Sequence, residues 1–128
     1  MLREATAFDG VRAAIMLKGF KLGDEAISKY TLQFDNCIVL TNGTDNIVCD
    51  NWEYSINRQF STLDVDNRCT TLFNDGAWWH FNCYRVNFNG RYSTVPTVGQ
   101  AKNIHWFNFR GFEESLKETK MLIRRTIQ

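Results

Sequence analysis

The chain has 128 residues, of which 44% are hydrophobic, 14% aromatic and 23% charged, as in one folded globular domain and unlike a disordered segment. Its formal net charge of +1 supplies no broad basic field, so we expect no nucleic-acid partner. The apolar runs are too short to cross a bilayer, so we expect no membrane insertion.

The first segment has the pattern of a β-hairpin. Two β-compatible runs, REATAF and VRAAIML, flank Asp9-Gly10, which is a strong signal for a two-residue turn. We expect the hairpin near residues 2–17 and a further strand near residues 29–34.

Loop-forming residues dominate the middle of the chain. Residues 35–110 are crowded with Asn, Asp, Gly and Thr, the residues of turns and irregular loops. Such a segment buries little apolar surface through regular structure, so it needs other anchors. The paired Trp78 and Trp79 in GAWWHFNC would supply them as core packing.

The C-terminal tail is ambiguous from its pattern. Phe112 and Leu116 are four residues apart, as are Glu113 and Lys117, which favours a helix. Residues 119–125 form an apolar group with basic flanks, which suits a strand equally well.

The four cysteines are too widely separated for CxxC metal motifs, which favours disulfides and an oxidising compartment. The chain as written shows no signal peptide, so we expect a piece of a secreted protein. His80 and His105 show no zinc-ligand spacing, and both are expected to be packed rather than catalytic. No nucleophile–base motif or phosphate-binding loop is present, so we predict no enzyme and no cofactor.

Several motifs together resemble the fibrinogen-related C-terminal domain of fibrinogen chains, ficolins, tachylectins and angiopoietins. They are FSTLDVDNRC, GAWWHFNC, NFNGRY, NIHWFNFRG and ESLKETKMLIRR. The opening LREATAFDG and the following FKLGDEAISKY resemble the preceding stretch of that family. The match covers nearly the whole chain but only about the C-terminal half of the module.

The resemblance implies an α+β fold with a twisted antiparallel sheet and a loop-rich, disulfide-stapled C-terminal lobe. It makes the tail a strand, so residues 1–34 and 119–125 would form the central-sheet part and residues 35–118 the binding lobe. We expect the sheet to keep an unpaired edge or an uncovered apolar face.

The family pattern also implies a disulfide between Cys69 and Cys83. Cys37 and Cys49 have no counterpart in the common pattern, and their proximity in sequence suggests a second, local disulfide. Two free buried thiols are the alternative.

The family's calcium loop resembles Asp64-Val65-Asp66-Asn67-Arg68 here, leaving Asp64 and Asp66 as candidate ligands. Arg68 occupies the position of a third acid, and its charge would repel a divalent cation. We expect calcium binding to be lost or much weakened, with Asp66 pairing with Arg68 or capping a turn.

The acetyl-group pocket of lectin-like relatives implies a ligand pocket formed by Phe73, Cys83, Tyr84 and Ala101. The resemblance also implies a cis peptide bond between Asn82 and Cys83, which would turn the following N–H groups toward the ligand. Tyr84 replaces a frequent histidine, while Gln100 and Glu114 replace frequent tyrosines, which weakens the apolar walls that an acetyl methyl needs.

Two functions follow from the resemblance. The first is a secreted, lectin-like module of innate defence that binds carbohydrate or acetylated surface patterns. The alternative is a receptor-binding or self-associating module whose ligand is a protein, with oligomerisation in a longer parent chain. Asn42-Gly43-Thr44 is an N-glycosylation sequon, so Asn42 is the expected acceptor in a secreted glycoprotein.

Overall fold

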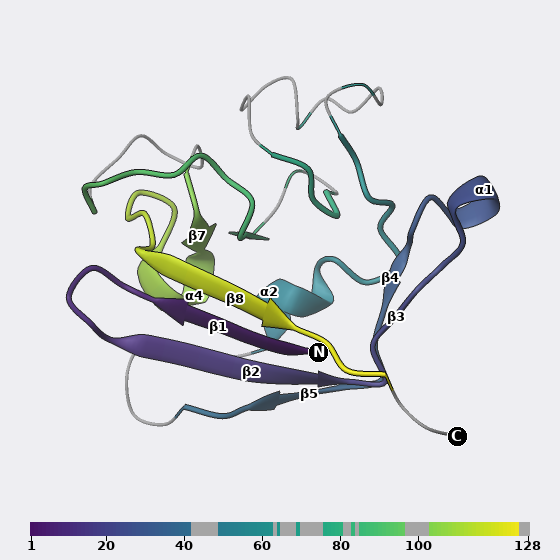
Figure 1. The fold of residues 1–128 in the computed structure, drawn as a ribbon, viewed down its shortest axis with the longest axis horizontal. Helices are drawn as coiled ribbons and strands as arrows, with labels where there is room; N and C mark the ends of the chain where they lie inside the picture. The colour runs from purple at the N-terminus through teal and green to yellow at the C-terminus, as the bar shows by residue number, and fades with distance from the viewer. Residues whose placement is uncertain are drawn as a thin grey trace.

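The computed structural model describes residues 1–41, 49–62, 64, 69, 76–80, 83, 85–96 and 103–125. Its main feature is an antiparallel four-stranded sheet with the strand order β5-β2-β1-β8 (Figure 1). The strands are β1 (Leu2–Thr6), β2 (Arg12–Lys18), β5 (Asn36–Val39) and β8 (Glu118–Leu122).

The predicted hairpin is confirmed, although its loop is longer than two residues. Strands β1 and β2 pair from Leu2 opposite Met16 to Thr6 opposite Arg12. The pairing continues to Ala7, whose N–H donates to the Val11 carbonyl at 2.8 Å. Gly10 lies inside this loop with φ +90°, a conformation that is cheap only for a residue without a Cβ. The loop therefore has three residues, 8–10, and Asp9-Gly10 are the last two of them.

The strand expected at residues 29–34 is wrong as a member of the central sheet. Only Leu32–Gln33 (β4) is extended, and it pairs with β3 (Lys21–Leu22) in a separate two-stranded sheet. The backbone is left-handed at Lys29 and Tyr30, with φ of 54° and 60°, which breaks an extended run. The next segment, β5, takes the edge position beside β2.

A short helix, α1 (Glu25–Ser28), connects β3 and β4. It begins at Asp24, whose side chain accepts a hydrogen bond from the Ile27 N–H at 3.0 Å, a standard N-cap contact. Figure 1 shows α1, β3 and β4 extending as an arm from one end of the sheet.

The tail is a strand, as the resemblance implies, and the helix alternative is wrong. Strand β8 pairs with β1 from Leu2 opposite Leu122 to Thr6 opposite Glu118. Before it, the Leu116 N–H donates to the Ile104 carbonyl at 2.9 Å. Leu116 is fully buried, so long-range packing overrides the local helical spacing.

The other elements span two to four residues each, in keeping with a loop-rich lobe. They are α2 (Asp50–Glu53), β6 (Val86–Asn87), β7 (His105–Trp106) and α4 (Phe107–Arg110). Small and aliphatic side chains of β1 and β2 share one core with the aromatic residues of this lobe. No helix in the described part of the chain is long and apolar enough to span a membrane.

Candidate functional site

The two neighbouring tryptophans lie in the core. Trp78 is fully buried and Trp79 is 6% exposed, with their rings edge to face at 5.1 Å. The Trp78 backbone pairs with Ser61 through two hydrogen bonds of 2.9 and 3.2 Å, and the Trp79 indole N–H donates to the Tyr30 carbonyl at 2.9 Å. Their predicted role as packing anchors is confirmed, and neither offers an open ring face to a ligand.

Trp52 is the centre of the aromatic cluster. Its ring meets Phe88 at 5.1 Å and Trp106 at 5.3 Å, both edge to face. It is carried by α2, immediately after Cys49. The short helix thus positions one of the fully buried tryptophans of this lobe.

Sequence reasoning missed Arg3, a buried cation on this cluster. Arg3 is fully buried, and its guanidinium carbon lies 4.3 Å from the Trp52 ring centroid and 5.4 Å from that of Trp78. Its Nε donates to the Met1 sulfur at 3.0 Å, while Nη1 and Nη2 have no hydrogen-bond partner. Burial lowers the pKa of Arg3 to about 9. The alternation of Arg3 with Ala5 and Ala7 was the available signal: Arg3 and Ala5 share the inner face of β1, and the pattern continues to Ala7, which is also buried just after the strand.

Both histidines are buried in the described structure. His105 Nδ1 lies 2.9 Å from the Asn103 carbonyl oxygen, and its ring stacks edge to face on Phe112 at 5.1 Å. Burial lowers the pKa of His80 and of His105 to about 4. Both side chains are therefore neutral near pH 7 and serve as packed polar groups.

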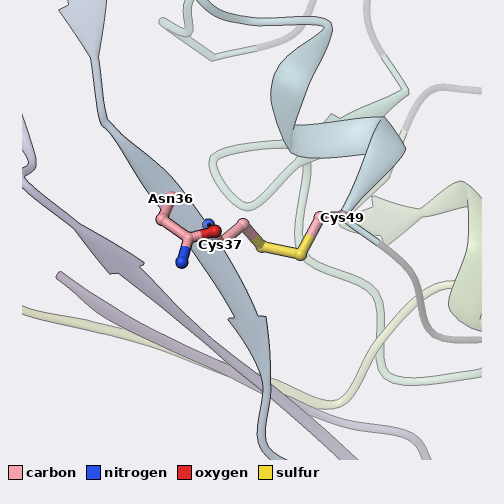
Figure 2. Close-up of a disulfide and its surroundings, with 3 residues drawn as sticks. All are labelled: Asn36, Cys37 and Cys49. Atoms are coloured by element: carbon pink, nitrogen blue, oxygen red, sulfur yellow. Dashed lines mark hydrogen bonds between the residues drawn. A yellow bond between two sulfur atoms is a disulfide. The ribbon is translucent and has the colours of Figure 1, made fainter.

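Two disulfides stabilise the lobe, and both join the cysteines that the sequence analysis pairs. Cys37 and Cys49, with Cα atoms 6.0 Å apart, connect β5 to the start of α2 (Figure 2). Cys69 and Cys83, with Cα atoms 5.3 Å apart, enclose the segment that contains the tryptophans. The described chain has no free cysteine.

The expected ligand pocket falls mostly outside the described residues. Cys83 is described and half-buried, whereas Phe73, Tyr84 and Ala101 lie outside, as does the Asn82 side of the predicted cis bond. The sequon residue Asn42 also lies outside. The pocket and the glycosylation site therefore stay predictions.

Of the two candidate calcium ligands, Asp64 lies in the part of the chain that the structure describes. Its carboxylate accepts a hydrogen bond from the Thr62 hydroxyl, and this contact lowers the Asp64 pKa. Asp66 and Arg68 lie outside the described residues. Within the part that is described, no three His, Cys, Asp or Glu side chains gather closely enough to hold a metal ion.

A shallow hollow lies on the outer face of the central sheet, away from this lobe. Its lining residues are Glu4, Thr6, Arg12, Glu118, Thr119 and Lys120. The charges there are already paired: Arg12 contacts Glu4 at 2.9 Å, and Lys120 contacts Glu118 at 3.3 Å. Exposed pairs of this kind offer little binding energy.

Comparison with known proteins identifies the domain type. The family model of the C-terminal globular domain of fibrinogen beta and gamma chains matches residues 1–126. The chain belongs to this family. Tenascin of Gallus gallus is 32% identical over 120 residues, covering 90% of the chain and 6% of tenascin. Fibrinogen C domain-containing protein 1-A of Xenopus laevis is 39% identical over 71 residues, covering 52% of the chain and 15% of that protein.

Solved structures share the fold of this fibrinogen-type chain. The fibrinogen-like globe domain of human ANGPTL6 superposes with a TM-score of 0.78 at 23% identity, over 92% of the chain and 52% of that domain. Lamprey fibrin D-dimer, solved with the peptide ligand Gly-His-Arg-Pro-amide, superposes with a TM-score of 0.73 at 19% identity. The match covers 99% of this chain and 48% of the lamprey chain. The chain thus spans about half the length of these structures. The family to which the chain belongs consists of non-enzymatic binding modules.

Proposed function

We propose that the chain is an extracellular recognition module whose ligand is a protein or peptide, bound at the face around Cys83 and residues 76–80. The observation that supports a peptide ligand is the structure of lamprey fibrin D-dimer, which has the same fold, with the peptide Gly-His-Arg-Pro-amide. Trp78 and Trp79 are buried, so their rings would support the site from the core and would not contact the ligand.

The relatives support the same choice. A peptide occupies lamprey fibrin, a protein of the same fold, and the family model is that of fibrinogen chains. Gln100 and Glu114 stand where lectin-like relatives often have tyrosine. This loss of apolar pocket walls also makes the lectin alternative weaker. Glu114 is engaged elsewhere, because its carboxylate lies 3.6 Å from the Arg110 guanidinium.

An extracellular location fits the covalent structure. Two disulfides close loops with sequence separations of 12 and 14 residues, and such structural disulfides persist in oxidising compartments. We infer secretion of the parent protein, with Asn42 as its glycan acceptor.

The test compares a peptide with a sugar on the oxidised chain. Titration of the ¹⁵N-labelled chain with Gly-His-Arg-Pro-amide should shift the amide signals of residues 76–80 and Cys83, and a peptide of scrambled order should not. The amides of Ala13 and Leu17, buried in β2, are the internal control.

The same chain is applied to N-acetylglucosamine resin with and without calcium. We expect it to pass through under both conditions. Retention that free N-acetylglucosamine reverses, together with no response to the peptide, would replace this proposal with the lectin function.

A further inference from the structure

The short ladder between β6 and β7 ends in an exposed arginine beside an exposed phenylalanine. Val86 lies opposite Trp106 in this ladder, and both side chains are buried. One residue further along, the Phe107 N–H donates to the Arg85 carbonyl at 2.8 Å. The side chains of Arg85 and Phe107 are exposed, as the alternation of faces along paired strands predicts.

Arg85 is held in place by an aromatic ring. Its guanidinium carbon lies over the Tyr54 ring, 5.2 Å from the centroid, and Tyr54 directly follows α2. A guanidinium that stacks on a ring keeps its N–H groups free to donate in its own plane. Among the described residues, no ion pair includes Arg85, so its charge is available to a partner.

Phe107 supplies the apolar part of the same surface. It is the first residue of α4, which follows β7 directly (Figure 1), and it is 41% exposed. Its ring stacks on Phe112 with centroids 4.6 Å apart, and Phe112 in turn packs on the buried His105. The Phe107 ring is therefore fixed from behind while part of it stays open to solvent. We call Tyr54, Arg85, Phe107 and Phe112 the Arg85–Phe107 surface.

Backbone hydrogen bonds hold the elements of this surface together. The Asn108 N–H donates to Asn51 Oδ1 at 2.8 Å, which joins α4 to α2. The bond from Phe107 to Arg85 joins α4 to the start of β6. A surface that is already ordered loses little conformational entropy when it binds a partner.

We propose that the Arg85–Phe107 surface binds a protein segment that carries one carboxylate with an apolar side chain two residues away. Arg85 donates charge-assisted hydrogen bonds to the carboxylate, and the apolar side chain packs on Phe107. In an extended segment, alternate side chains share a face about 6.6 Å apart, which suits the spacing of two residues opposite each other in a ladder. Aromatic residues and arginine are the types enriched at the energetic centres of protein interfaces.

The neighbouring charges limit how acidic the partner can be. Two exposed acids, Glu53 and Glu113, are next in sequence to the ring residues of the surface. Arg110, the other cation of α4, already contacts Asp9 at 2.9 Å. The described side chains here therefore supply one available cation and two acids, which favours a segment with a single acid over a polyanion.

The probe is the peptide acetyl-Phe-Ala-Asp-Ala-Phe-amide, whose single charge has an apolar residue two positions away on both sides. Titrated into the ¹⁵N-labelled oxidised chain, it should shift the amide signals of Tyr54, Arg85 and Phe107 saturably. The amides of Ala13 and Leu17, buried in β2, should not move. The peptide with Lys in place of Asp should cause no saturable shift.

Two variants test the two parts of the surface. Arg85→Glu should weaken binding of the Asp peptide at least about tenfold, because a charge-assisted contact becomes a repulsion. The same variant should gain binding of the Lys peptide, which a merely misfolded chain would not. Phe107→Ser should weaken binding of the Asp peptide by about tenfold through loss of the apolar contact.

Matched controls make the same exchanges elsewhere. Lys18→Glu reverses an exposed cation of β2, and Ile27→Ser removes an apolar side chain that is 86% exposed on α1. Both should leave the affinity for the Asp peptide unchanged. Gly-His-Arg-Pro-amide is basic, so Arg85 disfavours it, and adding it in excess should leave the shifts of the Asp peptide in place.

Absence of a saturable shift at Tyr54, Arg85 and Phe107 would overturn the proposal, as would unchanged affinity in Arg85→Glu. Displacement of the Asp peptide by Gly-His-Arg-Pro-amide would show one shared site and overturn the assignment of a second one. A heparin oligosaccharide that shifts the same amides and binds more tightly than the Asp peptide would replace the protein partner with a sulfated polysaccharide.

Discussion

Arg3 is a fully buried cation. Its two terminal nitrogens are buried without hydrogen-bond partners, and removing a charged group from water costs several kcal/mol. Cation–π contacts with the faces of Trp52 and Trp78, each worth about 0.5 to 2 kcal/mol, offset part of this desolvation cost. Burial lowers the pKa of Arg3 to about 9, the direction expected when a cation is removed from water.

We therefore expect Arg3→Met to raise the free energy of unfolding by about 1 to 3 kcal/mol, because methionine fills similar space without a buried charge. Urea denaturation measures the change. Arg12→Met is the control: Arg12 contacts Glu4 on the exposed face, so its loss should change stability by less than about 1 kcal/mol. A loss of stability in Arg3→Met would show that the cation–π contacts dominate.

The buried histidines make stability depend on pH. His80 and His105 have folded-state pKa values of about 4, lowered by burial, while an unfolded histidine titrates near 6.5. The unfolded chain therefore takes up more protons between these values, and the free energy of unfolding falls as pH falls from about 6.5 to about 4. Each histidine contributes a slope of up to about 1.4 kcal/mol per pH unit.

Urea midpoints measured across that pH window test this dependence. Carboxylates also titrate near its lower end, so the comparison uses His105→Gln, which removes one of the two histidine contributions. An unchanged slope in this variant would contradict the assignment to His105.

At the scale of elements, local sequence signals predicted those parts of the structure that depend on residues close together in sequence. Asp9-Gly10 identified the hairpin because the turn is local. The strand expected at 29–34 failed because Lys29 and Tyr30 take left-handed backbone conformations that their side chains do not signal. The tail was ambiguous because its strand form depends on pairing with β1, which lies more than a hundred residues earlier.

The disulfide between Cys37 and Cys49 connects β5 to the helix that carries Trp52. Replacing both cysteines with serine should lower the free energy of unfolding by about 3 kcal/mol, since the loop entropy of the unfolded chain is restored. Urea denaturation measures the loss, and amide exchange at Ile38 and Val39 should accelerate. Unchanged stability would mean that β5 and α2 are held by packing alone.

At the scale of the whole molecule, the family motifs and the composition predicted different parts of the structure. The pairing of Cys69 with Cys83 followed from the resemblance, and the burial of Trp78 and Trp79 followed from the scarcity of regular structure around them. Arg3 was missed because a charged residue in a strand is ordinarily read as exposed. Its burial depends on three tryptophans that arrive from distant parts of the chain.

The molecule should open in a graded way, with the arm of α1, β3 and β4 less stable than the central sheet. Only two residue pairs join β3 and β4, and Leu22 and Ile27 are 45% and 86% exposed. By contrast, Ala13 and Ile15 of β2 are fully buried. Local opening is therefore far cheaper in the arm.

Native-state amide exchange measures this difference within one sample, and Ile27 should exchange at least about a hundredfold faster than Ile15. Asp24→Ala removes the acceptor of the Ile27 N–H, so it should accelerate exchange at Ile27 further while leaving Ile15 unchanged. If Ile27 were as protected as Ile15, or if Asp24→Ala accelerated both alike, the arm and the sheet would unfold as a single cooperative unit. The N-cap would then stabilise the whole domain, because every opening that exposes Ile27 would also require the central sheet to separate.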